Sequence, residues 1–247
     1  MDRILYTAMV AAKQSQDQQA VVSNNLANAT TSGFREQIHA LRAVPVRGDG
    51  ALPTRVSMMA TTPGTDFSIG PINATGRDLD VALREGNWLA VQGADGAEAY
   101  TRRGDLQVNG EGLLTSGGRP VIGDGGPIVV PLGASLSIGA DGTVSAIGAG
   151  EQPDAIAEVG RLKLVNDTAG NLERGDDGLF RAGDGDGVLP RDELGRLQSG
   201  ALEGSNVSTM EAMVSMINTA RRYEMQLQVI EHTDQNAQRA NALLSMN

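Results

Sequence analysis

The sequence contains no cysteine and only two histidines, His39 and His232. The absence of cysteine excludes disulfides, thiolate metal sites and cysteine nucleophiles. Two histidines leave little material for imidazole catalysis or a zinc site. Aromatic residues are only 3% of the 247 residues. A chain so poor in large rings is expected to have a thin core for its length and to gain part of its stability from partners.

Positive charge is also scarce, with 20 basic against 30 acidic residues, a net charge of -10 and a pI near 4.7. Such a chain is not expected to bind nucleic acid or anionic lipid through bulk charge. No apolar run approaches the roughly 20 residues of a membrane span. The polar first 30 residues hold no signal-peptide core, so any export is expected to proceed without a cleaved signal.

Composition divides the chain into near-neutral ends and an acidic middle. Residues 35–204 carry 15 bases, 24 acids and all nine prolines. The sequence predicts a mixed α and β fold in three parts. Residues 1–34 plus 205–247 form a terminal helical domain, 35–78 form an extended connector, and 79–204 form a central all-β domain.

The N-terminal end has the periodicity of a helix, with a seam of small residues that repeats at spacings of four and three. Its members are Met1, Leu5, Ala8, Ala12, Ser15, Gln19, Val22 and Leu26. The helix is expected to stop near Asn28, and Gly33 suits the left-handed turn that follows.

The C-terminal end predicts a longer helix that begins with a capping box, Ser208 to Glu211. From Ser208 to Leu244 it would span roughly 55 Å, which is longer than a domain of this size and requires another helix as cover. Its predicted stripe is Thr209, Met213, Met216, Ala220, Tyr223, Leu227, Ile230, Asp234, Ala237, Asn241 and Leu244. The two long terminal helices are therefore predicted to pair as an α-helical, coiled-coil-like domain.

The middle has the alternation of β-strands. Leu79, Val81 and Leu83 alternate with Asp80 and Ala82. The dipeptide at 141–142, Asp-Gly, lies between two alternating runs and predicts a hairpin. Four prolines and few strand signals favour an extended connector over 35–78.

Three features could carry chemistry. Asp184, Asp186, Gly187 and Glu193 match part of a calcium loop, but the first ligand position would be Ala182, so a solvated acidic turn is preferred. The glycine-rich segment 123–126 lacks the lysine and the strand–turn–helix setting of a phosphate cradle. Paired acids such as those at 78 and 80 decorate a strand without an aromatic sugar-binding cleft. We therefore expect no enzyme, cofactor, metal or small-molecule substrate.

Asn24, Asn25 and Asn28 lie near the end of the first helix. They are consistent with a fraying terminus rich in capping residues. They are also consistent with a polar device that fixes the register of packed helices, which the seam beside them favours.

Four segments resemble the axial proteins of the bacterial flagellum, a family of rod, hook and hook-associated proteins. They are NNLANATTSGF at 24–34, DLDVALREGNWLAVQ at 78–92, YTRRGDLQVNGEGLLTSGGRPVIG at 100–123 and GALEGSNVSTMEAMVSMINTARRYEMQLQVI at 200–230. The resemblance runs along nearly the whole chain, and its two terminal motifs stand in the family's order.

The resemblance implies a structural subunit of the basal-body rod, which crosses the periplasm as a drive shaft and export channel for motility. It implies export by the flagellar type III apparatus and contacts with that apparatus, with other rod subunits and with further copies of itself. The alternative within the family is a distal-rod or hook-type protein. From different classes, an adhesin-like or cap protein and a wall-remodelling enzyme remain open.

The seams and the resemblance together predict an assembly interface on the chain ends. Its residues are Leu5, Ala8, Ala12, Val22, Asn24, Asn25, Leu26, Asn28, Gly33, Phe34, Asn206, Val207, Met213, Met216, Tyr223, Leu227 and Ile230.

Overall fold

A computed structural model describes residues 2–39, 41–45, 56–60, 64–148, 156–167, 170–183 and 188–244. The chain divides into two units, each described by itself. Unit 1 consists of residues 1–29, 35–67 and 207–247, and unit 2 of residues 30–34 and 68–206. The candidate calcium-loop residues Asp184, Asp186 and Gly187 lie outside the described residues.

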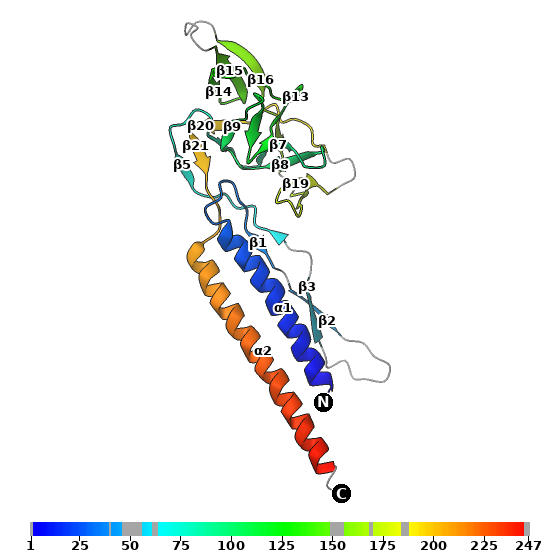
Figure 1. Cartoon of the computed structure of the whole chain (residues 1–247). Coiled ribbons are helices and arrows are strands. Elements are labelled where there is room, and N and C mark those ends of the chain that lie inside the picture. Colours follow the sequence, from blue (N-terminus) through cyan, green and yellow to red (C-terminus); the bar gives the residue numbers. More distant parts are fainter. Residues whose placement is uncertain are drawn as a thin grey trace. The chain divides into compact units, whose positions relative to one another are not determined.

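Unit 1 contains two helices, α1 (Asp2–Ala27) and α2 (Thr209–Leu244), which run antiparallel and side by side (Figure 1). Local signals explain where they begin and end. The Glu211 N–H donates to Ser208 Oγ at 3.4 Å, which caps one free amide of the first turn of α2. The Asn28 N–H still donates to the Asn24 carbonyl at 3.1 Å, so α1 completes its last turn there.

Unit 1 also contains four short strands between its helices. β1 (Gln37–Ile38) pairs with β4 (Gly64–Thr65), and β2 (Leu41–Pro45) pairs with β3 (Val56–Ala60), both antiparallel. Pro45 is the last residue of β2, where the ladder ends and a missing N–H costs least.

The predicted fold class is therefore wrong in two respects. The segment 35–78 is not an extended connector: it contains β1–β4, which share a unit with the helices, and one strand of unit 2. Nor do the helices form the predicted coiled-coil pair, because the buried side of α2 matches the predicted stripe only in part, and Met213, Ala220 and Leu227 of that stripe are exposed. The four prolines suggested an extended connector, but short strands tolerate proline at their ends. The molecule is a mixed α and β protein with two helices and a large β-rich middle among the described residues.

Unit 2 is built from short antiparallel strands. They are β5 (Ile72–Ala74), β6 (Val81–Leu83), β7 (Asn87–Gln92), β8 (Glu98–Thr101), β9 (Leu106–Val108), β10 (Leu114–Ser116), β11 (Arg119–Pro120), β12 (Ile122–Gly123), β13 (Gly126–Pro127), β14 (Ser135–Ile138), β15 (Thr143–Ile147), β16 (Ala157–Arg161), β17 (Leu164–Asn166), β18 (Leu172–Arg174), β19 (Phe180–Ala182), β20 (Leu197–Ser199) and β21 (Ala201–Glu203). The largest sheet has the order β17-β7-β8-β19-β18, and β20 and β21 return to pair with β6 and β5.

Strand β7 separates two apolar clusters in unit 2. Its alternate side chains point to opposite faces of the sheet, so Leu89 and Val91 enter one cluster while Trp88 and Ala90 enter the other. In the second cluster the Trp88 and Phe180 rings lie 4.6 Å apart between centroids. The middle of the chain therefore has an aliphatic core of its own despite the scarcity of aromatic residues.

Candidate assembly interface

The face of α1 that lies towards α2 is made of small side chains. Ala8, Ala12, Ser15 and Val22 are buried, and Leu5 is half-buried. These positions repeat at spacings of four and three, which keeps them on one side of the helix. Small residues let the two helix axes approach closely, although each buries little apolar area. Leu26, near the end of α1, is half-buried as well.

The buried side of α2 repeats at the same spacing. Its buried and half-buried members are Ala212, Met216, Thr219, Tyr223, Gln226, Ile230, Thr233 and Ala237. Two hydrogen bonds fix the register of this side on α1. Ser15 Oγ donates to Gln226 Oε1 at 3.0 Å, and Gln16 Nε2 donates to the Tyr223 hydroxyl at 3.2 Å. The two fully buried residues of this side, Ala212 and Thr219, are therefore small, and its larger residues are only half-buried.

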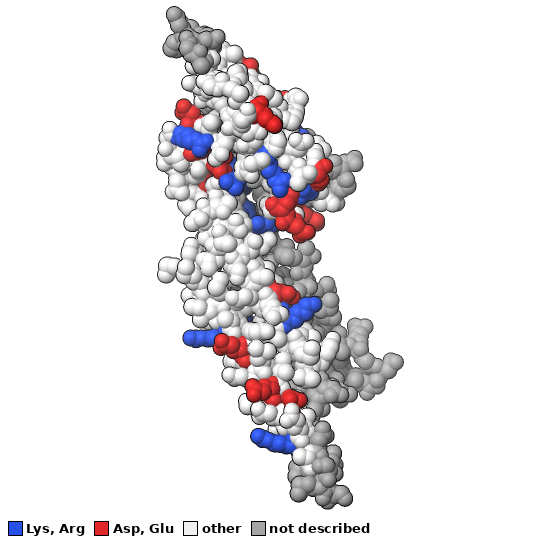
Figure 2. Space-filling view, viewed as in Figure 1, with Lys and Arg blue, Asp and Glu red and all other residues white. Residues whose placement is uncertain are grey.

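Large apolar residues of α2 point elsewhere. Met213 and Leu227, both predicted for the assembly interface, are 50% and 45% exposed in the single chain. Met210, at 80% exposed, and Val214 and Ile217 share the side of α2 that faces away from α1. In Figure 2 the visible helix surface is largely uncharged, with a few acidic and basic residues along it, some of them next to one another. The apolar surface that α1 does not cover is available to another molecule.

The three asparagines near the end of α1 have different environments. Asn25 is buried and pairs with the backbone of β1: its Nδ2 donates to the Gln37 carbonyl and its Oδ1 accepts the Gln37 N–H, each at 2.9 Å. Asn28 Nδ2 donates to the Asn24 carbonyl at 3.0 Å, and the Asn24 side chain is exposed. Asn25 therefore ties α1 to β1 within its own chain.

Gly33 occupies a position in unit 2 that only glycine fits. Its φ is +67°, a left-handed conformation that side chains rarely adopt. A Cβ there would lie 2.3 Å from the carbonyl carbon and oxygen of Arg102. The Gly33 N–H donates to the Glu203 carbonyl at 2.8 Å. The end of the N-terminal motif thus lies directly against the start of the C-terminal one.

Phe34 and Asn206 strengthen the same junction. The Phe34 ring is buried beneath the guanidinium of Arg174, 4.5 Å from its centroid, and burial lowers the pKa of Arg174. The Asn206 N–H donates to the Phe34 carbonyl at 3.3 Å, and Asn206 Nδ2 donates to the Ser68 carbonyl at 3.1 Å. Val207, the next residue, is buried and belongs to unit 1.

A buried ion pair at the centre of this junction was missed by the sequence analysis. Arg102 Nε and Nη2 donate to Glu203 Oε2 at 2.8 and 2.6 Å, and the two side chains are 2% and 1% exposed. The remaining guanidinium hydrogens reach the carbonyls of Leu83, Arg84 and Asn87. All five donors of Arg102 are therefore used, as a buried guanidinium requires.

Glu203 is also held by backbone, since its Oε1 accepts the Gly70 N–H at 3.1 Å. The pair thus joins β6, the end of β8, β21 and the segment that leads to β5. The signal in the sequence was an arginine inside a β pattern and a glutamate just before the C-terminal motif. The sequence alone does not show that either side chain is buried.

A second polar contact involves Ser32, whose hydroxyl donates to Asp105 Oδ1 at 3.2 Å. Burial alone would raise the pKa of Asp105, but hydrogen bonds from Arg103 and Ser32 outweigh it, and the pKa of this carboxyl is lowered. The carboxylate therefore stays ionised and anchors both the Thr30–Phe34 segment and β9.

No group of three or more potential metal-binding side chains occurs within the described ranges. Nor does any helix in the part of the chain that the structure describes have the length and apolar character of a membrane span.

Three family models match segments of this sequence in order. They are described as flagella basal body rod protein, over residues 5–35; flagellar hook protein FlgE/F/G D1 domain, over 84–146; and flagellar basal body rod FlgEFG protein C-terminal, over 198–243. Together with the relatives below, these matches show that the chain belongs to the family of flagellar basal-body rod proteins.

Curated relatives carry more particular names. The flagellar basal-body rod protein FlgF of Escherichia coli is 55% identical, and that of Salmonella typhimurium 54%, each over the full length of both chains. FlgG of Bacillus subtilis is 28% identical over 95% of this chain and 96% of its own. The start of the chain and LRAVPV at 41–46 most resemble FlgF, and this prediction is confirmed.

Proposed function

We propose that this chain is a structural subunit of the flagellar basal-body rod. Copies polymerise through the chain ends and form part of the drive shaft and export channel that cross the periplasm. The observation that carries the proposal is the 55% identity to a basal-body rod protein over the full length of both chains.

Features of unit 1 support a role in assembly. Its helices meet through small and polar residues, while Met210, Met213 and Ile217 remain exposed. Exposed apolar surface on a helix is typical of a protein interface. Burial of that surface in a polymer would supply the stability that the helix pair lacks alone.

The proposed partners are neighbouring rod subunits, further copies of this chain and the flagellar type III export apparatus. Export would take place without a cleaved signal peptide. The role is non-enzymatic: the buried pair of Arg102 and Glu203 in unit 2 is enclosed, and all five guanidinium donors are hydrogen-bonded, as is typical of a structural ion pair.

Deletion and complementation test the proposal. The gene for this chain would be deleted from its host, and a copy with an epitope tag in the loop after Gly110 would be returned. We expect the deletion to abolish swimming, and the returned chain to restore it and to copurify with isolated basal bodies at fixed ratio to the other rod proteins. Swimming by the deletion strain, or a returned chain absent from basal bodies, would refute the proposal.

A further inference from the structure

Each helix of unit 1 has an exposed face that none of the described residues of unit 1 covers. On α1 this open face consists of Tyr6, Lys13, Asp17, Ala20, Asn24 and Ala27. On α2 the open face consists of Met210, Val214, Ile217, Arg221, Glu224 and His232. At about 100° per residue, both sets lie roughly opposite the sides by which the two helices touch each other.

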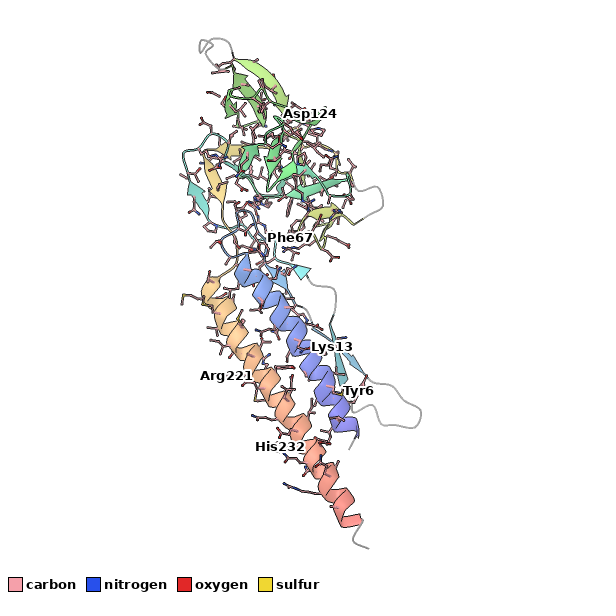
Figure 3. All side chains as sticks on the ribbon, in the orientation of Figure 1. Tyr6, Lys13, Phe67, Asp124, Arg221 and His232 are labelled. Atoms are coloured by element: carbon pink, nitrogen blue, oxygen red, sulfur yellow. The ribbon has the colours of Figure 1, made fainter. Side chains whose placement is uncertain are left out.

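Figure 3 places the labelled members accordingly. Tyr6 and Lys13 lie on the side of α1 away from α2, and Arg221 and His232 lie on the side of α2 away from α1. The strands of unit 1 approach a third side of α1, where Asn25 binds β1, so the open face of α1 stays uncovered.

The two open faces are complementary in charge when laid antiparallel. Lys13 falls opposite Glu224, and one turn further along Asp17 falls opposite Arg221. None of these four residues forms an ion pair with another charged group in the described part of the chain. A partner with the reverse order of charges would satisfy all four at once.

The same register is complementary in size. Beyond the charged pairs, Ala20 falls opposite Ile217, and Ala27 falls opposite Met210. Asn24 falls opposite Val214. The small side chains of one helix thus receive the large exposed ones of the other, as close helix packing requires. At the far end of the register, Tyr6 meets His232.

Other registers fail on the same residues. A shift of one heptad in one direction places Lys13 against Ile217 and Asp17 against Val214, which buries charge against apolar surface. A shift in the other direction places Ala20 against Glu224 and moves Arg221 from Asp17 to Asn24, so the second ion pair is lost. Of the three registers compared, only the first both forms the two ion pairs and places small side chains opposite large ones.

We infer that the open face of α2 binds the open face of α1 of a second copy of this chain, antiparallel, with Lys13 opposite Glu224 and Ala20 opposite Ile217. The inference rests on the proposed function, because it assigns the surface through which copies meet in the rod. Since α1 and α2 are antiparallel within one copy, the next copy points in the same direction as the first. The contact uses two different faces, so it repeats without closing on a dimer and generates a ring or a helical row.

Disulfide cross-linking tests this contact cleanly, because the chain has no cysteine. The variant Ala20→Cys with Ile217→Cys would be expressed in the deletion host, and isolated basal bodies would be oxidised in air with copper phenanthroline. The two positions lie on opposite sides of the helix pair, beyond the reach of a disulfide within one chain. We expect dimers and higher products of this chain on non-reducing gels.

The matched control is Ala27→Cys with Ile217→Cys, which keeps every charge but is one heptad out of register; it should give no ladder. Adding Lys13→Glu to the cross-linking variant should reduce the product about two- to fivefold, the effect of one exposed ion pair. Adding Glu224→Lys as well should restore it.

The outcomes separate the two proposals. If the variant is present in basal bodies and supports swimming but gives no cross-link between copies, the contact is wrong and the proposed function stands. Equal products from the matched and shifted pairs also contradict the contact. If the chain is absent from basal bodies, the proposed function falls and the contact falls with it.

Discussion

Unit 2 buries leucine, valine and aromatic side chains in its two clusters, whereas the fully buried residues between the helices of unit 1 are mostly alanine, serine and threonine, and the larger Met216, Tyr223 and Ile230 are only half-buried. A fully buried Leu or Val side chain contributes about 1.5–3 kcal/mol, and an alanine much less. Unit 2 therefore carries its own stabilisation within one chain. Unit 1 keeps much of its apolar surface, such as Met210 and Ile217, outside the contact between its helices.

The difference teaches how one sequence can hold a stable fold and a surface for partners. A helix pair that buried its large residues internally would have no reason to associate. The variants below perturb one unit at a time, from the largest expected effect to the smallest. Trp88, the single tryptophan, is buried in unit 2, so its fluorescence reports that unit alone.

Removal of Glu203 should have the largest effect. Glu203→Ala leaves the guanidinium of Arg102 buried without its carboxylate, at a cost of about 3–5 kcal/mol in the free energy of unfolding. We expect the unfolding midpoint, followed by Trp88 fluorescence, to shift to a much lower urea concentration. Glu203→Gln keeps an oxygen acceptor, so its unfolding midpoint in urea should fall between those of the unchanged chain and Glu203→Ala. An unchanged transition in Glu203→Ala would show that the pair is dispensable.

Gly33→Ala should come next. A left-handed alanine costs about 1–2 kcal/mol, and overlap with the Arg102 carbonyl adds about 1–3 kcal/mol. The control is Gly76→Ala, which has a similar φ of +73° but no atom within 4 Å of the added Cβ. Both are measured by Trp88 fluorescence in urea. If the two variants lost the same stability, the overlap of the added Cβ with Arg102 would contribute nothing.

Asn25→Ala tests unit 1. The variant loses both hydrogen bonds to Gln37, a cost of about 1–3 kcal/mol. Hydrogen exchange at the Gln37 amide should accelerate strongly, while the Trp88 transition of unit 2 should change little. Asn24→Ala, at an exposed neighbour, should leave exchange at Gln37 within a factor of about two. Protection of the Gln37 amide in Asn25→Ala would contradict this assignment.

The smallest effects are expected on α2. Ile230 is half-buried, so Ile230→Ala should lower the free energy of unfolding of the helices by about 1 kcal/mol. This is less than the cost of the same change at a fully buried site. Leu227→Ala should stay within about 0.5 kcal/mol in the isolated chain. Far-ultraviolet circular dichroism during heating measures both. A larger loss in Leu227→Ala would place Leu227 inside the helix contact.

Periodicity alone predicted much of the secondary structure. The hairpin expected at Asp141-Gly142 corresponds to β14 and β15, with Gly142 at φ +87°. Periodicity could not choose which of two adjacent stripes on α2 faces α1. The predicted stripe and the buried side share Met216, Tyr223, Ile230 and Ala237, and at the positions between them the two sets differ by one residue. Hydrophobicity favours Leu227, whereas the structure turns Gln226 towards Ser15.

Two further features lay beyond sequence reasoning for physical reasons. The strands of 35–67 are short and pair only with one another, so their pattern is too brief to show a period. The Arg102–Glu203 pair joins residues 101 positions apart, and a charged residue gives no local sign of burial. Gly33 was identified as a turn residue, but its contact with Arg102 depends on the fold.

The positions of the Glu203 partners along the chain have a consequence for synthesis. Gly70 lies 133 positions before Glu203, and Gly33 lies still earlier. Contacts so distant in sequence form slowly, because a long loop must close before they give any stabilisation. A ribosome that adds about 5–20 residues per second releases Glu203 near the end of translation. Unit 2 therefore cannot complete its fold until Glu203 has been synthesised.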